Sequence, residues 1–382
     1  MYFGVDYYPE QWVFPYGGTP ENPESQWELD AELMVKAGVN VVRLGEYSWG
    51  LSEREEGQFD FSWLRRVMDV MEKHGIHVVL ATPTAAPPVW LAKKHPEILP
   101  RDERGLVIHE GTRRAVCFNN DTYWNFSKRI VEEMAKALGD HPQLIAWQID
   151  SGIGGHQSEW SFNEDTKLEW QNWLKLKYET VERLNQQLGL YYLGQVVNSF
   201  DEAPMPMRAP TMHNAALLLD WARFSSDTIV AFVRMQTEVL AEITPNIPTT
   251  TNLRALQRKF DHFDVAKVID FVSVESNAAI KSKASELACD IDILRSLKKE
   301  NIRTPDGDCG FWVIEQKAGQ VNWQDVNSLV RPGVVGLFTY QLLSRGACGV
   351  LYYHWRQSRI GNEKFFGAVV PHHFQPNSRA FK

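Results

Sequence analysis

The sequence is short of cysteine, of long hydrophobic runs and of basic charge, and each shortage excludes a class of protein. Its four cysteines, Cys117, Cys289, Cys309 and Cys348, are widely spaced without a CxxC pair, so we expect free thiols. No apolar run reaches the ~18 residues of a membrane helix, and the N-terminus lacks the features of a signal peptide. A cytoplasmic protein with no membrane contact is therefore expected. The net charge of −8 leaves no basic stripe, so nucleic acid is not an expected partner.

What the chain does contain is ordinary globular composition, with 44% hydrophobic and 23% charged residues. A length of 382 residues would normally suggest two or three domains, yet an α/β barrel can hold such a chain as one unit. The 14 tryptophans are numerous, and indole faces bind the C–H faces of sugars. Most of them are expected to pack in the core.

Eight short apolar runs alternate with helical patterns, which is typical of repeated βα units around a parallel sheet. The expected strands are Tyr2–Asp6, Asn40–Leu44, His77–Ala81, Leu144–Ile149, Thr249–Leu253, Asp270–Val274, Phe311–Ile314 and Gly349–Trp355. We predict an α/β fold of the (β/α)8 TIM barrel type, with residues 1–382 as a single domain and an elaborated region at about 151–223 after strand four. A doubly wound sheet would need a glycine-rich turn after its first strand, and VDYYPEQW has none.

In such a barrel, active-site residues lie at the carboxyl ends of the strands. This rule selects Asp6, Arg43, Glu46, Thr82, Asp150, Asn252, Glu275, Glu315 and Arg356. Glu315 stands out because it directly follows the buried run FWVI, so its carboxylate can emerge at the mouth of the barrel. A purely structural role remains open, in which Glu315 pairs with Arg43 or Arg356.

Several long motifs, in order along the chain, resemble glycoside hydrolase family 42. They are MYFGVDYYPEQW, AGVNVVRLGEYSW, ATPTAAPPVWL, AWQID, VIEQKAGQVNW, RPG and YHWRQSRIGNEKFFGAVVPH. The resemblance implies a retaining β-galactosidase that uses an acid/base Glu after strand four and a nucleophilic Glu after strand seven. In a retaining enzyme the two carboxyl groups lie about 5 Å apart. By motif, Glu315 takes the place of the nucleophile.

The chain departs from the family at strand four, where the usual WQ-x-DNE reads WQIDSG. Ser151 stands at the position of the sugar-binding Asn and Gly152 at that of the acid/base Glu. Glycine cannot transfer a proton, and general acid–base catalysis is commonly worth ~10²–10⁴ in rate. Hydrolysis of unactivated sugars should therefore be slow.

Other pocket positions are partly kept. By the same resemblance, Arg113, Trp323 and Glu363 match sugar-binding residues, although surface pairing and packing are the plain alternatives. Phe366 replaces the usual His, Leu193 replaces a Trp, and Asn277 falls near a Tyr. His156 and Glu275 are two candidates for a substitute proton donor, and His156 could equally be a solvated loop residue.

The zinc-binding cysteines of many relatives are mostly missing. Only Cys117 has a match, while Ser161, Asn163 and Thr166 occupy the other places, so no metal and no cofactor are expected.

Three hypotheses follow. The chain is a β-galactosidase-like hydrolase with Glu315 as nucleophile, or a catalytically impaired barrel that binds a glycan without efficient hydrolysis, or an engineered or evolved barrel for another ligand. The first is favoured because the nucleophile is kept. The expected partner is a β-galactoside-like carbohydrate, and a homo-oligomer is possible.

Overall fold

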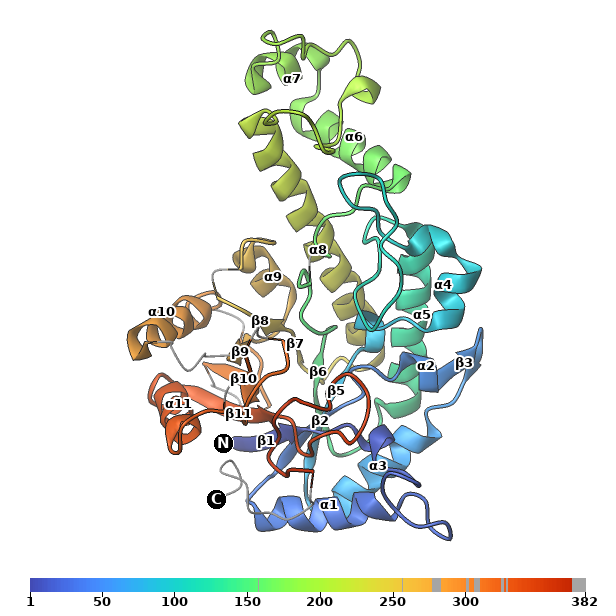
Figure 1. Cartoon of the computed structure of the whole chain (residues 1–382), viewed down its shortest axis with the longest axis vertical. Helices are drawn as coiled ribbons and strands as arrows, with labels where there is room; N and C mark the ends of the chain where they lie inside the picture. The colour runs from blue at the N-terminus through green and yellow to red at the C-terminus, as the bar shows by residue number, and fades with distance from the viewer. Residues whose placement is uncertain are drawn as a thin grey trace.

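Eight parallel β-segments, one of them interrupted, form a barrel in the computed structural model (Figure 1). The structure describes residues 1–156, 158–255, 257–276, 283–299, 302–305, 310–323, 326–327 and 329–372. The barrel strands are β1 (Tyr2–Asp6), β2 (Val41–Leu44), β5 (His77–Ala81), β6 (Leu144–Gln148), β7 (Thr249–Thr250), β8 (Asn252–Leu253), β9 (Ser273–Ser276), β10 (Phe311–Lys317) and β11 (Ala347–Tyr353). The predicted (β/α)8 fold is confirmed, and β1 and β5 have the predicted bounds.

The fifth strand is interrupted at Thr251. Its first half, β7, pairs with β6, and its second half, β8, pairs with β9. Side chains bridge the interruption, because Thr251 Oγ1 donates to the Ile149 carbonyl at 2.8 Å and Ser273 Oγ donates to the Thr251 carbonyl at 2.9 Å. The two halves together close the ring between β6 and β9.

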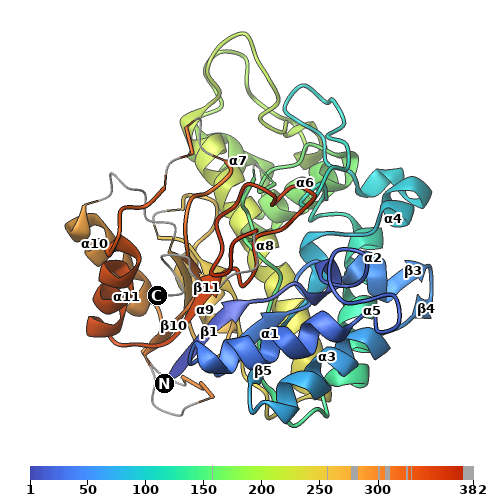
Figure 2. The same cartoon turned by 60° about the horizontal axis from the view of Figure 1, so that its bottom comes forward.

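Helices surround the barrel, and Figure 2 shows α1 and α3 lying side by side on its outside. The helices are α1 (Ser25–Lys36), α2 (Trp49–Ser52), α3 (Ser62–Lys73), α4 (Val89–Lys94), α5 (Asp121–Leu138), α6 (Glu164–Tyr178), α7 (Val181–Leu188), α8 (Ala215–Ile243), α9 (His262–Val268), α10 (Ala284–Arg295) and α11 (Val334–Ser344). Short 3-10 turns lie at Pro9–Gln11, Pro83–Ala85, Pro96–Ile98 and Phe200–Glu202. A two-stranded hairpin, β3 (Glu53–Glu55) with β4 (Gln58–Phe59), stands apart from the barrel sheet.

The barrel interior is filled in layers. Alternate residues of a strand face opposite sides, so one set points to the axis and the other to the helices. The inner apolar layer contains Val41, Val79, Ala146, Trp312 and Leu351. Toward the carboxyl ends of the strands, the next inward residues are polar, with Arg43 two residues after Val41 and Gln148 two residues after Ala146. The core therefore changes from apolar to polar at the mouth.

A β-bulge turns Glu315 inward. Trp312 and Ile314 belong to the inner layer, so strict alternation would point Glu315 at the helices. The pairing of β10 with β9 shifts register between Val313 and Glu315, which breaks the alternation. Bulges of this kind re-aim side chains. The Glu315 carboxylate consequently reaches the polar layer.

The predicted elaborated region at 151–223 contains α6, α7 and the first part of α8, which extend from the barrel at the top of Figure 1. It has an apolar core separate from the barrel core, built around Trp170, Leu174, Leu188 and Trp221. Asn214 begins α8 by accepting the backbone N–H groups of Ala216 and Leu217.

The free-thiol prediction was partly wrong. Cys117 and Cys289 are free, whereas Cys348 is disulfide-bonded. Cys309 lies outside the described residues. In a barrel, segments far apart in sequence become neighbours, so wide spacing along the chain does not keep cysteines apart. Within the described residues, no helix has both the length and the apolar content needed to cross a membrane.

Candidate active site

A cavity of about 330 Å³ opens at the carboxyl ends of the strands. Seven of the residues that the sequence assigned to the catalytic and sugar-binding site line it, namely Glu315, Gly152, Arg113, Ser151, Trp323, Glu363 and Phe366. They come from strand β10 itself and from the loops after β5, β6, β10 and β11. Residues as far apart in the chain as Arg113 and Phe366 are thus brought to one place by the closure of the barrel, as the strand-end rule expects.

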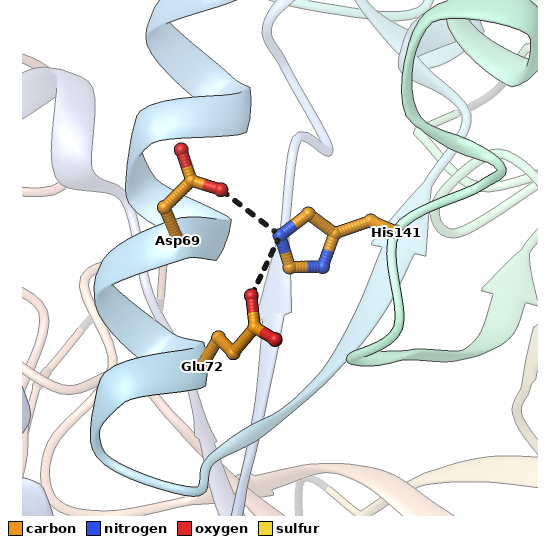
Figure 3. A group of neighbouring side chains, drawn as sticks. All are labelled: Asp69, Glu72 and His141. Atoms are coloured by element: carbon orange, nitrogen blue, oxygen red, sulfur yellow. Dashed lines mark hydrogen bonds and ion pairs between the residues drawn. The ribbon is translucent and has the colours of Figure 1, made fainter.

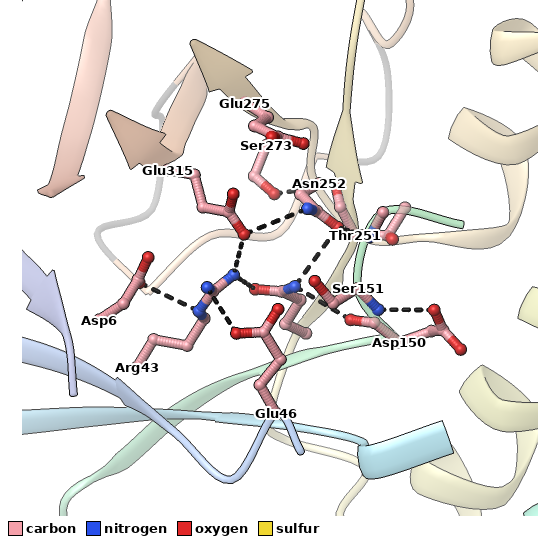
Figure 4. Close-up of polar contacts among 12 residues, drawn as sticks. Asp6, Arg43, Glu46, Asp150, Ser151, Thr251, Asn252, Ser273, Glu275 and Glu315 are labelled. Atoms are coloured by element: carbon pink, nitrogen blue, oxygen red, sulfur yellow. Dashed lines mark hydrogen bonds and ion pairs between the residues drawn. The ribbon is translucent and has the colours of Figure 1, made fainter. Parts of the chain in front are cut away.

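Arg43 organises the floor of this cavity (Figure 4). Its guanidinium binds three carboxylates: Nη1 contacts Glu315 Oε1 at 2.8 Å, Nη2 contacts Glu46 Oε2 at 2.8 Å, and Nε contacts Asp6 Oδ1 at 3.0 Å. Arg43 Nη1 also donates to Gln148 Oε1 at 2.9 Å. Arg43 is only 1% exposed, so these pairs hold Glu315 in a water-poor setting.

Asn252 connects the Glu315 carboxylate to the loop that carries Gly152. Its Nδ2 donates to Glu315 Oε1 at 3.4 Å, and its Oδ1 accepts the Gly152 backbone N–H at 2.8 Å. Gln148 Nε2 donates to the Asp150 carbonyl at 3.0 Å and so supports the same loop. Glu315 and Gly152 therefore lie on opposite sides of one asparagine side chain.

The carboxyls around Arg43 titrate differently. Burial and the neighbouring Glu275 raise the pKa of Glu315 to about 8, and Arg43 opposes this shift. Burial would also raise the pKa of Glu46, but Arg43 and three hydroxyl groups hold it below its usual value. Those hydroxyls belong to Ser151, Tyr8 and Tyr47. Two nearby carboxyls with pKa values pushed apart are typical of a catalytic site.

The loop at Gly152 has an unusual backbone. Asp150, Gly152, Gly154 and His156 have φ values of 54°, 60°, 67° and 55°, all in the left-handed region. The buried Asp150 carboxylate fixes the loop, because its Oδ2 accepts Thr84 Oγ1 at 2.6 Å and its Oδ1 pairs with Arg114. Beside Gly152 there is room for a side chain: among the described residues, adjoining ones aside, a β-carbon there would meet only Arg114 Nη2, at 4.0 Å.

His156 and Glu275 both line the cavity, but neither suits the role of proton donor. Burial, with Arg113, Arg114 and Arg254 nearby, lowers the pKa of His156 to about 4, so the ring is neutral at neutral pH. Glu275 is bound by Arg254, whose Nε donates to Glu275 Oε2 at 2.6 Å. Arg254 Nη2 donates to the other oxygen, Oε1, so both oxygens of Glu275 are already engaged by arginine.

The rest of the cavity wall offers groups that suit a sugar. Arg113 donates to the Tyr47 hydroxyl, and Trp323 is 57% exposed at the rim. Asn322 Nδ2 lies 3.4 Å from Glu363 Oε2. Phe366 is buried against Tyr353, with the ring centroids 4.7 Å apart. Charged groups for hydroxyls and an exposed indole for C–H faces form a mixed surface of the kind that binds carbohydrate.

The comparison with known sequences decides the family: residues 6–382 match the model of glycoside hydrolase family 42, described as beta-galactosidase. The chain belongs to glycoside hydrolase family 42. It is 37% identical over 381 residues to a beta-galactosidase of Geobacillus kaustophilus and 35% identical over 383 residues to one of Heyndrickxia coagulans. All of this chain is covered in both cases, but only 54% and 55% of the relatives. The chain thus spans about half the length of the curated relatives it matches.

Solved structures agree with this assignment. The beta-galactosidase of the psychrophilic Marinomonas ef1 superposes with a TM-score of 0.90 at 32% identity, and that of the haloarchaeon Halorubrum lacusprofundi with 0.91 at 32%. Each match covers 100% of this chain, and 58% and 56% of the respective solved chains. The family 42 resemblance read from the sequence motifs is confirmed.

One position that the family 42 resemblance assigned to the sugar pocket does not line the cavity. Leu193 lies in the elaborated region, where it lines a different cavity with Leu188 and Leu190 and is 75% exposed. The expectation that Leu193 lies in the sugar pocket was wrong, because no continuous family motif surrounds it in this long loop to fix which position it matches. Asn277 lies outside the described residues. Arg356, selected by the strand-end rule, points elsewhere and binds the buried Asp30, with Nε 2.5 Å from Oδ1.

The sequence reading missed four residues that line the family 42 cavity: Tyr47, Arg254, Asn322 and Tyr353. Arg254 directly follows β8 and Tyr353 ends β11, so a stricter use of the strand-end rule could have found both. Tyr47 and Asn322 lie on loops after strands, and only the spatial arrangement identifies them.

The positions matched to the family 42 zinc ligands do come together, as a hydrogen-bonded cluster. Cys117 Sγ lies 3.3 Å from Thr166 Oγ1, and Ser161 Oγ donates to Asn163 Oδ1 at 2.5 Å. Asn163 Nδ2 donates to the Leu99 carbonyl at 2.9 Å. Burial raises the pKa of the Cys117 thiol, which disfavours the thiolate that zinc needs. The donor set does not fit a thiolate zinc site.

Among the described residues, one other group could share a metal ion: Asp69, Glu72 and His141 (Figure 3). It lies at the start of β6, at the opposite end of the family 42 barrel from the cavity. His141 Nδ1 accepts the Gln143 backbone N–H at 3.2 Å, so Nε2 carries the proton and faces Asp69 Oδ1 at 3.3 Å. A protonated Nε2 cannot ligate a metal, so we interpret the group as hydrogen-bonded packing of α3 against the barrel.

Proposed function

We propose that this chain is the catalytic barrel of a retaining β-galactosidase-type hydrolase that acts on terminal β-galactosides or related sugars. Glu315 is the nucleophile, and Gly152 occupies the place of the absent acid/base. The family membership supports the reaction class. The observation that carries the residue assignment is the bridge through Asn252, which puts an inward-facing carboxylate and an open, side-chain-free position across one cavity.

Glu315 is suited to attack the anomeric carbon once it is ionised. Arg43 and Asn252 contact its Oε1, which fixes the carboxylate in one orientation toward the cavity. The raised pKa means that the free carboxylate is high in energy, and forming a bond to the sugar removes that charge. A galactose ring would lie between this group and the rim residues Arg113, Trp323 and Glu363.

Loss of the leaving group is then the difficult step. With neither Gly152 nor the neutral His156 able to donate a proton, a sugar alkoxide must leave with protonation by water only. A leaving group that is already a stable anion needs no proton. We therefore expect activity on activated aryl galactosides and little activity on lactose.

The test compares 2,4-dinitrophenyl β-galactoside with lactose, and adds a trapping experiment. A 2-deoxy-2-fluoro-galactoside with the same leaving group should accumulate as a covalent adduct, and peptide mapping should find it on Glu315. Release of dinitrophenolate with an adduct on Glu315 supports the proposal. An adduct on another residue would contradict the nucleophile assignment. Galactose binding without any adduct or turnover would favour a glycan-binding barrel.

A further inference from the structure

The missing side chain at Gly152 leaves an open space on the cavity wall. Gly152 and Ser151 both line the cavity. Of the atoms in the described part of the chain, adjoining residues aside, a β-carbon on Gly152 would meet only Arg114 Nη2 within 4 Å. The space lies across Asn252 from Glu315, on the side where a leaving group or an incoming acceptor must lie. A small molecule placed there can reach the anomeric carbon of a sugar bound to Glu315.

Three arginines lie around this space, and the carboxyl groups of Glu275, Glu315 and Glu363 line the same cavity. Arg113 and Arg254 line the cavity, and the 3% exposed Arg114 lies behind Gly152. Arg114 pairs with Asp150 through Nη2, while its buried Nε and Nη1 have no hydrogen-bond partner among the described residues. Arg113 donates to the Tyr47 hydroxyl with Glu46 and Glu315 nearby, and Arg254 is paired with Glu275, so neither offers an unshared positive charge. Arg114 is the cation that favours a small anion here, because its Nη2 is the nearest atom to the open space.

We propose that the space beside Gly152 is a binding site for a small anion, azide or a carboxylate such as formate, which takes over the chemistry of the missing side chain. The inference rests on the proposed function. In the first step, a Glu315 carboxylate oxygen bonds to the anomeric carbon and the aryloxide leaves with the bonding electron pair. In the second, azide nitrogen bonds to the anomeric carbon while the bond to Glu315 breaks and its electron pair returns to the carboxylate. The product is β-galactosyl azide.

Formate in the same place acts as a base. It takes a proton from a water molecule whose oxygen bonds to the anomeric carbon, the Glu315 ester bond breaks, and galactose is released. The formic acid then loses its proton to the solvent. Azide changes the product, and formate changes only the rate.

The experiment measures turnover of 2,4-dinitrophenyl β-galactoside with increasing sodium azide or sodium formate, with sodium chloride at equal ionic strength as the control. We expect azide to raise kcat by about 10-fold or more and formate by less, within the range that acid–base catalysis spans. Proton NMR should show β-galactosyl azide as the azide product. Two variants locate the effect: Gly152→Gln fills the space without charge, and Gly152→Glu fills it with a carboxylate. Both should lose the azide response.

The outcomes separate this inference from the proposed function. Turnover with a Glu315 adduct, but no response to azide and no azide product, overturns the anion site and leaves the nucleophile standing. An α-azide product would also overturn it, because azide would then have displaced the aryloxide directly. A full azide response in Gly152→Gln would put the anion elsewhere. No turnover with or without azide, and no adduct, overturns the proposed function and the anion site together.

Discussion

Glu315 and Gly152 are joined through one side chain, that of Asn252, which donates to the carboxylate at 3.4 Å and accepts the glycine N–H at 2.8 Å. Strand β10 supplies the first residue, the loop after β6 the second, and β8 the bridge. The relative position of the nucleophile and the acid/base site is thus fixed by the interrupted fifth strand. The absence of an acid/base side chain at Gly152 leaves this connection intact, because Asn252 binds the Gly152 backbone and not a side chain.

Arg43 is expected to be the residue on which the floor of the site depends. Arg43→Met leaves Asp6, Glu46 and Glu315 buried without their cation, and breaking a buried ion pair in this way costs ~3–5 kcal/mol. Chemical denaturation should show a loss of that size.

The matched control is Arg66→Met, since the pair of Arg66 with Glu24, at 2.6 Å, lies on the surface. An exposed pair contributes less than ~1 kcal/mol. If the two variants lost equal free energy of unfolding, the ion pairs of Arg43 would be as well solvated as the surface pair of Arg66, and the prediction would be contradicted.

Glu315→Gln is expected to change the pH dependence of stability. Because the pKa of Glu315 is raised from 4.5 to about 8, the folded protein holds a proton between those values that the unfolded chain has lost. The stabilisation that this proton provides is therefore complete below about pH 4.5 and is lost as the pH rises through about 8. Glutamine has no such proton.

The measurement is the difference in Tm, variant minus wild type, from pH 4.5 to pH 9. This difference in Tm should rise with pH. Between pH 4.5 and pH 9 the rise should correspond to at least ~1 kcal/mol in the free energy of unfolding. Loss of the Arg43 pair adds a constant offset, so the trend is the test. A flat or falling difference would mean that Glu315 is ionised in the folded protein at neutral pH.

The variants Gly152→Ala and Gly4→Ala distinguish two causes of lost stability, backbone strain and steric overlap. Gly152 has φ +60° with its nearest neighbour at 4.0 Å, so alanine adds only backbone strain of ~1–2 kcal/mol. At Gly4 a β-carbon would lie 2.2 Å from the Val41 carbonyl oxygen, so β1 and β2 must separate. We expect Gly4→Ala to cost ~3 kcal/mol or more, or to prevent folding. Thermal unfolding of the two variants checks the order, and a greater loss for Gly152→Ala would contradict it.

The sequence predicted the barrel because the spacing of apolar residues differs between strands and helices. This pattern is clear in β1 and β5. It could not predict the interruption at Thr251, which depends on hydrogen bonds to Ile149 and Ser273, residues distant in the chain. Strand β9 was expected at Asp270–Val274 but begins at Ser273. Asp270 instead accepts the Thr249 backbone N–H at 2.8 Å. Where a side chain takes the place of a backbone hydrogen bond between strands, the end of the strand shifts. The spacing of apolar residues in the sequence does not reveal such a shift.

The site was predictable where motifs were long and continuous. Glu315, Trp323 and Glu363 were found in this way, and the cavity contains them. Leu193 was misplaced because it lies in a long loop where no continuous motif fixes its register. The strand-end rule selected Arg43 and Asn252, and the pairing of Glu315 with Arg43 was one structural alternative that the contacts bear out. The bridge through Asn252 lies across the barrel, and no local pattern encodes it. The bulge before Glu315 likewise depends on the pairing of β10 with β9.

The central claim is that Gly152 marks the place of a missing proton donor opposite Glu315. Its most direct test is hydrolysis of lactose by Gly152→Glu and by Gly152→Glu combined with Ser151→Asn. We predict a rise of at least ~10²-fold, since a carboxyl at this place can protonate the departing oxygen. The φ of +60° should lower the stability of both variants slightly, so folding is verified by circular dichroism.

Adding Glu315→Ala to the restored protein should abolish the gained activity, because no covalent intermediate can form. A folded Gly152→Glu protein that hydrolyses no β-galactoside faster than the starting chain would contradict the account.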